Sequence, residues 1–186
     1  MKLTQVVKNL FIANSLVFIL LFFNSLPFVN SFVLHSFISS EFNFFQLFSY
    51  MFIHASFTHI LLNMLGLVTF GPELEEYFGK SKFISFYFIC GVLGGIVHSL
   101  FSLSPVVGAS AAIWGLMIVY AILNPNRILH LYFLLPVKAK WIIGVFFGIE
   151  LILAITNSSD GISHLAHIGG ALGGILFYFL NKKADF

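Results

Sequence analysis

The chain has 186 residues, of which 59% are hydrophobic and only 9% are charged. A soluble domain carries about 25% charged residues, so this composition excludes an ordinary soluble domain and indicates a membrane protein. The formal net charge of +2 is too small, and the basic residues are too scattered, for a nucleic-acid-binding protein. The single cysteine, Cys90, excludes an internal disulfide and a multi-cysteine metal site.

Six apolar stretches are long enough, with their flanks, to cross a bilayer, which takes roughly 20 residues. They lie at about 8–28, 57–78, 83–103, 109–124, 140–156 and 162–181. The first resembles a secretion signal, but no small-residue cleavage site follows it, so we expect it to be retained. Between the first two stretches, a segment rich in Phe and Ser predicts a long membrane-associated loop with short interfacial helices. The sequence therefore predicts an all-α membrane protein with six transmembrane helices, forming one domain over residues 1–186.

All nine Lys and Arg residues lie at alternate ends of these stretches. They are Lys2, Lys8, Lys80, Lys82, Arg127, Lys138, Lys140, Lys182 and Lys183. By the positive-inside rule, both termini are expected to be cytoplasmic. The second, fourth and sixth stretches then begin at the outer face and run inward.

Three polar residues lie near the start of the three stretches that run inward: His59, Ser110 and His167. Each falls within the first two helical turns, so we expect all three at one depth, roughly 3–10 Å below the outer surface. Polar groups inside a bilayer are costly unless they are partnered. Their coincidence at one depth therefore indicates a functional site.

The residue types suit the chemistry of acyl transfer. His59 and Asn63 are four residues apart, so they share a helix face, and both can donate hydrogen bonds to an oxyanion. The alternative is that this pair only joins helices. Ser110 follows Gly108 at a helix N-terminus, where unpaired N–H groups and the helix dipole favour negative charge.

His167 is followed by the stretch IGGALGG. Its glycines form two small-xxx-small patterns, Gly169 with Gly173 and Gly170 with Gly174. If the helix of Ser110 is the partner, His167 comes within hydrogen-bond reach of Ser110 and can act as its general base. Trp114, one turn below Ser110, is expected to stack on the imidazole or to serve only in packing.

The stretches HASFTHILLN, GAS and AHIGGALGG, in this order, resemble the rhomboid intramembrane serine proteases. The resemblance covers nearly the whole chain and implies a rhomboid-like bundle of six helices. It implies a catalytic dyad of Ser110 and His167. It also implies an oxyanion hole made by His59, Asn63 and the Ser110 backbone N–H. Supporting roles are implied for Gly108, His54 and Trp114.

Several residues near these motifs carry separate expectations. Many family members have Trp-Arg in the first loop where this chain has Phe45-Gln46, so the anchoring of the loop should differ here. Glu75 and Gly79 resemble the family's E-x-x-x-G turn, a structural element. His98 is expected to make a structural hydrogen bond.

No third catalytic acid is evident from the sequence. Asp160 lies in a loop, and Glu150 lies on the fifth stretch, where it could be neutral, paired to a histidine or facing a cavity. We therefore expect a dyad whose imidazole is held by packing. No metal or other cofactor is expected, because His54, His59, His164 and His167 form no H-E-x-x-H motif and have no acid beside them.

The resemblance implies a serine endopeptidase that cleaves transmembrane helices of single-span or multi-span membrane proteins near the outer face. Substrate helices should contain Gly, Pro or other helix-destabilising residues, because an intact membrane helix hides its backbone. The lipid bilayer is the solvent, no nucleic acid is a partner, and the short chain favours a bacterial plasma membrane.

Three alternatives remain open from the sequence. The first is a metal site on the histidines, and the second is a small transporter, which would predict internal repeats. The third is a non-catalytic rhomboid-like factor that binds membrane proteins. Such relatives usually lack the Ser or the His, and this chain has both.

Overall fold

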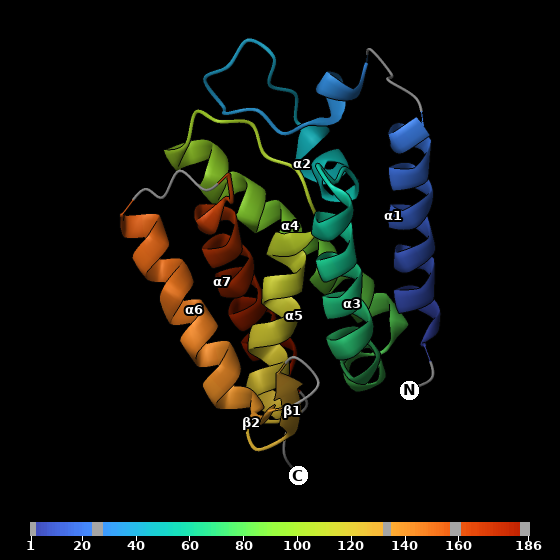
Figure 1. Ribbon diagram of the computed structural model, residues 1–186, viewed down its shortest axis with the longest axis vertical. Coiled ribbons are helices and arrows are strands. Elements are labelled where there is room, and N and C mark those ends of the chain that lie inside the picture. The colour runs from blue at the N-terminus through green and yellow to red at the C-terminus, as the bar shows by residue number, and fades with distance from the viewer. Residues whose placement is uncertain (1–2, 24–27, 132–134, 157–160, 183–186) are drawn as a thin grey trace.

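Six long helices run between the two ends of the molecule (Figure 1) within residues 3–23, 28–131, 135–156 and 161–182, the part that the computed structural model describes. They are α1 (Gln5–Phe23), α3 (Phe57–Phe78), α4 (Lys80–Phe101), α5 (Ser110–Leu123), α6 (Ala139–Ile155) and α7 (His164–Asn181). The shorter elements are η1 (Val29–Phe32), α2 (Gln46–Ser49), η2 (Tyr50–Phe52), β1 (Ile128–Leu131) and β2 (Leu135–Lys138).

The long helices coincide with the predicted apolar stretches to within a few residues at each end. The largest difference is in the first stretch, where α1 ends at Phe23 and residues 24–27 lie outside the described part. Of the described helices, α1 and α4 are long and apolar enough to cross a membrane on their own. A third span is counted if α2–η2 and α3, which meet at a 98° bend, form one unit, and α5 is a shorter apolar helix.

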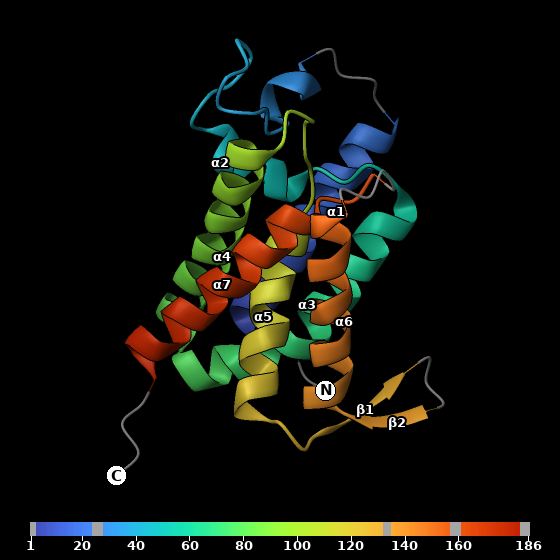
Figure 2. The same ribbon diagram turned by 90° about the vertical axis from the view of Figure 1, so that its left-hand side faces the viewer.

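The expectation of an all-α chain is wrong at one place, because β1 and β2 form an antiparallel hairpin. The pairing runs from Ile128 opposite Lys138 to Leu131 opposite Leu135, and the hairpin projects from the lower end (Figure 2). A search for span-length apolar stretches cannot detect strands of four residues, whose stability comes from their pairing.

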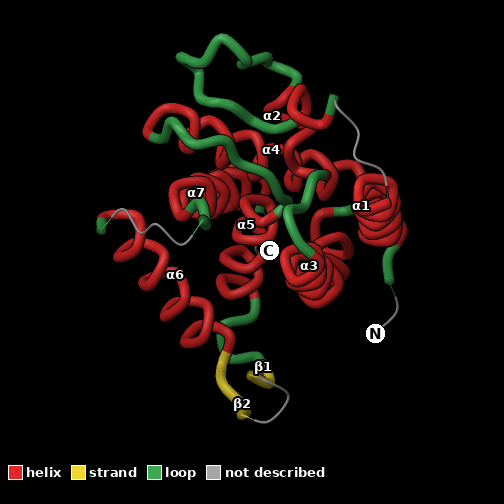
Figure 3. The backbone as a smooth tube through the Cα atoms, turned by 45° about the horizontal axis from the view of Figure 1, so that its top comes forward, coloured by secondary structure: helices red, strands yellow, loops and turns green. Residues whose placement is uncertain are grey.

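The helix that begins at Ser110 lies at the centre of the bundle. Figure 3 shows α5 between α3, α4 and α7, with α1 and α6 at the periphery. Eight of the 14 residues of α5 are buried, whereas α6 buries only Ala139 and Ile143. Packing on several sides therefore fixes the helix of Ser110 more firmly than α6.

The two glycine rows of α7 contact two different helices. Gly170 and Gly174 lie against α5, where a Cβ on Gly170 would collide with the backbone carbonyl of Ala111. Gly169 and Gly173 lie against α4. The expected close approach of α7 to the helix of Ser110 is therefore present, and the second row adds an equally close approach to α4.

The side chain of Gln46 cross-links the first loop by hydrogen bonds to its backbone. This side chain is almost fully buried, with 1% of the residue exposed. Nε2 donates to the carbonyls of Ser31 (3.3 Å) and Glu41 (2.8 Å), and Oε1 accepts from the N–H groups of His35 (3.3 Å) and Asn43 (3.2 Å). One amide thus satisfies four backbone groups.

We expect Gln46→Leu to lower the melting temperature in detergent by about 5–10 °C, because it leaves several buried backbone groups without partners. The volume of the side chain changes little, so packing alone predicts a smaller loss. Phe45→Leu, at the exposed neighbouring position, is the matched control and should melt close to the wild type. Equal melting of the two variants would show that the amide does not anchor the loop.

Glu75 and Gly79 have the structural roles that the E-x-x-x-G turn implies. The buried Glu75 carboxylate, on α3, accepts from Thr4 Oγ1 (2.5 Å) and from the N–H groups of Val6 (3.0 Å) and Val7 (2.9 Å). Thr4 directly precedes α1 and the two valines lie in its first turn, so Glu75 caps that helix from its neighbour. Gly79 ends α3 with a φ of +80°.

Candidate active site

The three helices that begin at the upper end of the bundle bring the candidate residues together. His59 is the third residue of α3, Ser110 is the first of α5 and His167 is the fourth of α7. Figure 1 shows these three helix starts facing the same end, opposite the start of α1 and the end of α7. The lengths and directions of the helices thus bring residues far apart in sequence to one region.

Serine caps determine where α3 and α7 begin. Ser56 Oγ accepts from the His59 N–H (3.1 Å), and Ser163 Oγ accepts from the Ala166 N–H (3.2 Å). The Ser163 hydroxyl also lies 2.6 Å from His98 Nδ1, and the other ring nitrogen of His98 lies 2.7 Å from the Ser104 carbonyl. The predicted structural hydrogen bond of His98 is confirmed.

The Ser110 hydroxyl and the His167 imidazole are hydrogen-bonded, with 2.8 Å between Oγ and Nε2. The close contact of Gly170 with Ala111 explains how α7 carries His167 this near to α5. The N-terminus of α5 has no side-chain cap. Its first N–H groups have no intrahelical partner, so they can stabilise negative charge beside Ser110.

Gly108 allows the ring of His59 to lie against the chain two residues before Ser110. Its φ is +116°, a conformation that favours glycine, and its N–H donates to the Tyr50 carbonyl (2.9 Å). A Cβ at this position would be 2.5 Å from His59 Nε2. Any other residue here would strain the backbone and displace the imidazole.

Asn63 and His54 both contact His59. The Asn63 Nδ2 donates to the His59 carbonyl (2.8 Å), and its Oδ1 is buried without a hydrogen-bond partner among the described residues. The ring of His54 packs edge-on against that of His59, with centroids 5.0 Å apart. Both residues thus contact His59, whose ring lies against Gly108, two residues before Ser110.

Trp114 packs against the general-base candidate. Its ring centroid lies 5.9 Å from that of His167, with the planes tilted by 35°. It also contacts Phe147 of α6 at 6.0 Å and is 8% exposed. The expected packing of an aromatic residue on the imidazole is therefore present.

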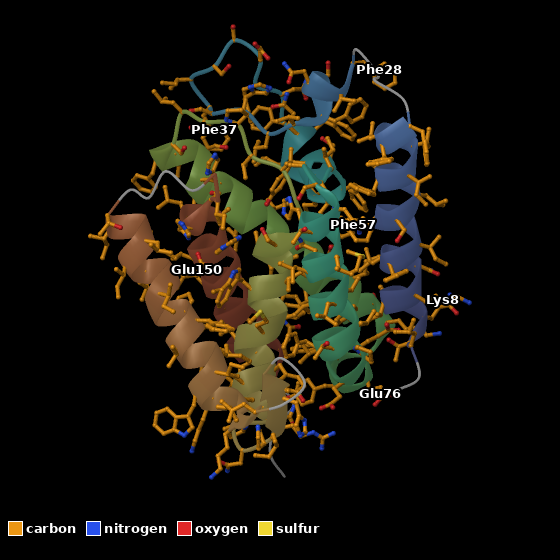
Figure 4. All side chains as sticks on the ribbon, in the orientation of Figure 1. Lys8, Phe28, Phe37, Phe57, Glu76 and Glu150 are labelled. Atoms are coloured by element: carbon orange, nitrogen blue, oxygen red, sulfur yellow. The ribbon has the colours of Figure 1, made fainter. Side chains whose placement is uncertain are left out.

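Of the three possibilities left open for Glu150, the structure shows pairing with histidines, so the imidazole of His167 is not held by packing alone. Glu150 Oε2 lies 2.9 Å from His167 Nδ1 and 2.6 Å from His164 Nδ1. Glu150 is in the upper half of α6, on the side toward α7 (Figure 4). An acid inside an apolar span was the available sequence signal, but sequence alone does not specify which helix face it occupies.

Glu150, His164 and His167 have ligand atoms within 4.8 Å of one another, so this cluster is where the described residues could hold a metal ion. Oxygen and nitrogen are suitable ligands for zinc, and tetrahedral ligands lie roughly 3.3 Å apart. The Oε2 distances of 2.6 and 2.9 Å are shorter than this and are typical of hydrogen-bonded or ionic pairs. The cluster has the geometry of a polar network.

Two apolar grooves lie beside α1, away from these residues. One is between α1 and the first loop, and the other is between α1 and α3. None of the candidate site residues lines either groove. The case for a functional site therefore depends on the polar contacts among α3, α5, α6 and α7.

Comparison with known proteins gives consistent matches. The family model described as "Rhomboid domain" matches residues 41–183. "RHOMBOID-like protein 12, mitochondrial" of Arabidopsis thaliana is 30% identical over 213 residues, covering 98% of this chain and 60% of that protein. "Putative rhomboid protease YdcA" of Bacillus subtilis (strain 168) is 34% identical over 134 residues, covering 69% and 62%.

A third relative, "Rhomboid protease GluP" of Bacillus subtilis (strain 168), is 29% identical over 124 residues, covering 66% of this chain and 23% of that protein. The chain thus spans about 60% of the length of the first two relatives and less of the third.

Proposed function

Because this chain belongs to the rhomboid family, we propose that it is an intramembrane serine endopeptidase with Ser110 as nucleophile and His167 as general base. Family membership and the apolar helices make the chain a multi-pass integral membrane protein. The observation that carries the proposal is the 2.8 Å hydrogen bond between Ser110 Oγ and His167 Nε2. It favours a protease over a non-catalytic rhomboid-like factor, which has no need of this pair.

The proposed topology has six spans and both termini in the cytoplasm. The basic residues support it, because those described lie toward the lower end of the bundle in Figure 1, near the start of α1, the start of α4, the hairpin and the end of α7. The site would then lie toward the outer face, and peptide cleavage would occur at that depth.

In the proposed reaction, Ser110 Oγ attacks the scissile carbonyl while His167 Nε2 takes the hydroxyl proton. The carbon–nitrogen bond then breaks, and His167 gives the proton to the leaving amine. Water next attacks the acyl-enzyme, with His167 accepting a proton and returning it to Ser110 as the carboxylic product leaves. The proton of Ser110 leaves and returns across the 2.8 Å contact between Oγ and Nε2.

The oxyanion would be stabilised by the Ser110 N–H, His59 and Asn63. The uncapped N-terminus of α5 and the position of the His59 ring beside Gly108 support this assignment. Loss of one such donor lowers kcat by about 10²–10³ in a serine protease. Gly108 and His54 would support the site by keeping the ring of His59 in place, and Trp114 by packing on His167.

The substrate class is membrane proteins, as the family implies. We propose that single-span and multi-span substrates are cut where the helix contains Gly, Pro or another weak helix former. A protease must reach the peptide backbone, and such residues release it from the helical hydrogen bonds at least cost.

The test uses purified wild-type protein in detergent with a membrane-helix substrate carrying Gly near its outer end, and a fluorophosphonate that reacts with activated serines. We expect cleavage near the Gly and covalent labelling of Ser110 by mass spectrometry. The matched substrate with Leu in place of Gly should be cut more slowly. Labelling of another serine would refute the assignment. So would unlabelled Ser110 together with continued cleavage of the substrate after treatment with excess fluorophosphonate.

A further inference from the structure

The second ring nitrogen of His167 decides whether this imidazole can act as a base. Nε2 faces Ser110 Oγ at 2.8 Å. To take the hydroxyl proton, Nε2 must direct its lone pair at Ser110, so the single proton of the neutral ring must be on Nδ1. In the other tautomer the Nε2–H would donate to Ser110, and no base would face the hydroxyl.

The group that faces Nδ1 is the carboxylate of Glu150, with 2.9 Å between Oε2 and Nδ1. An ionised carboxylate only accepts hydrogen bonds, so it favours the tautomer with the proton on Nδ1. The Glu150 and His167 side chains are only 13% and 10% exposed. Solvent therefore screens their interaction less than it would screen a surface pair.

The contact is shared and not linear. Oε2 also lies 2.6 Å from Nδ1 of His164, one turn before His167 on α7. His167 Nδ1 has no well-aligned hydrogen bond among the described residues, although the distance to Oε2 is short. We therefore expect a smaller effect than that of a linear acid–histidine bond.

A purely mechanical role for Glu150 is the competing explanation. Only Ala139 and Ile143 of α6 are buried, both in the lower half of that helix, and Gly144 and Gly148 have no neighbours where a Cβ would be. The pair of Glu150 with His164 could simply hold the upper half of α6 against α7. This role predicts changes in stability and in substrate binding, without a specific effect on the activation of Ser110.

We propose that Glu150 is a positioning residue that holds His167 in the Nδ1–H tautomer, so that α5, α7 and α6 together supply a Ser110–His167–Glu150 triad. The inference rests on the proposed function, because it concerns the base of that reaction. It extends the dyad expected from the sequence by one residue, which acts on Ser110 only through the imidazole.

The experiment compares Glu150→Gln, Glu150→Asp and the control Ile152→Ala, which changes an exposed residue on the same helix. For each purified protein, kcat and KM are measured separately on the Gly-containing substrate. The rate of fluorophosphonate labelling of Ser110 and the melting temperature are measured in parallel. Wild type and Ser110→Ala are included to test the proposed function independently.

Glu150→Gln keeps the size of the side chain but removes its charge and allows an amide to face Nδ1. We expect a loss of about 10- to 10³-fold in kcat, less than the roughly 10⁴-fold loss for the acid of a linear triad. KM should change by less than about twofold, and Ser110 labelling should slow in proportion to kcat. Glu150→Asp should recover part of the rate, and Ile152→Ala should match the wild type.

Unchanged kcat and labelling in Glu150→Gln, or a rise in KM with unaltered kcat, would overturn the triad while leaving the protease intact. Activity abolished by a chelator and restored by zinc would also overturn it, because Glu150 would then be a metal ligand. Failure of the proposed function would give a different result. The wild type would not cleave the substrate, or Ser110→Ala would still cleave it.

Discussion

Ser110→Ala and His167→Ala are each expected to reduce substrate cleavage by roughly 10⁴- to 10⁶-fold, which is to background in a detergent assay. Alanine at position 110 leaves no nucleophile. Alanine at position 167 leaves the hydroxyl without the base that now lies 2.8 Å from it. Because the two groups act in one step, the double variant should be no slower than either single variant.

The matched control is His130→Ala. His130 is exposed and lies on the hairpin at the opposite end of the bundle, so its loss should leave kcat and KM unchanged. Ser110→Ala should melt within a few degrees of the wild type, because it removes one hydroxyl at the end of a helix. Independent, multiplying losses in the double variant would show that the two residues do not act as a unit.

The sequence predicted the long helices, and the common end of the bundle where His59, Ser110 and His167 lie, because both depend on one-dimensional signals. Apolar length located α3, α5 and α7, and the basic residues gave their direction. Residues in the first turns of parallel helices then lie at one end, whatever the details of packing. The roles proposed for Ser110, His59 and His167 came from their residue types and from the family resemblance.

The sequence did not predict the contacts that depend on helix rotation and loop folding. The pairing of Glu150 with His167 requires a particular face of α6 to be turned toward α7. The bonds of Gln46 require the first loop to fold around one amide, so they involve residues 31, 35, 41 and 43 at once. Such contacts are set in three dimensions and leave no periodic pattern in the chain.

The spacing between α5 and α7 is expected to control activity, because it sets the distance between Ser110 and His167. Gly170→Ala would place a methyl group against the backbone carbonyl of Ala111. A backbone atom cannot change rotamer, so relief requires α7 to move away from α5. A displacement of about 1 Å costs on the order of 10²-fold in rate when it misplaces reacting groups.

We therefore expect Gly170→Ala to lower kcat by about 10²-fold and the free energy of unfolding by roughly 1–3 kcal/mol through overpacking. Gly144→Ala, in α6, makes the same change where a Cβ meets no atom within 4 Å. It should stabilise the helix by about 0.5–1 kcal/mol and leave kcat unchanged. The measurements are kcat and thermal unfolding in the same detergent. If Gly170→Ala kept full activity, the 2.8 Å contact of Ser110 with His167 would not depend on the close approach of α7.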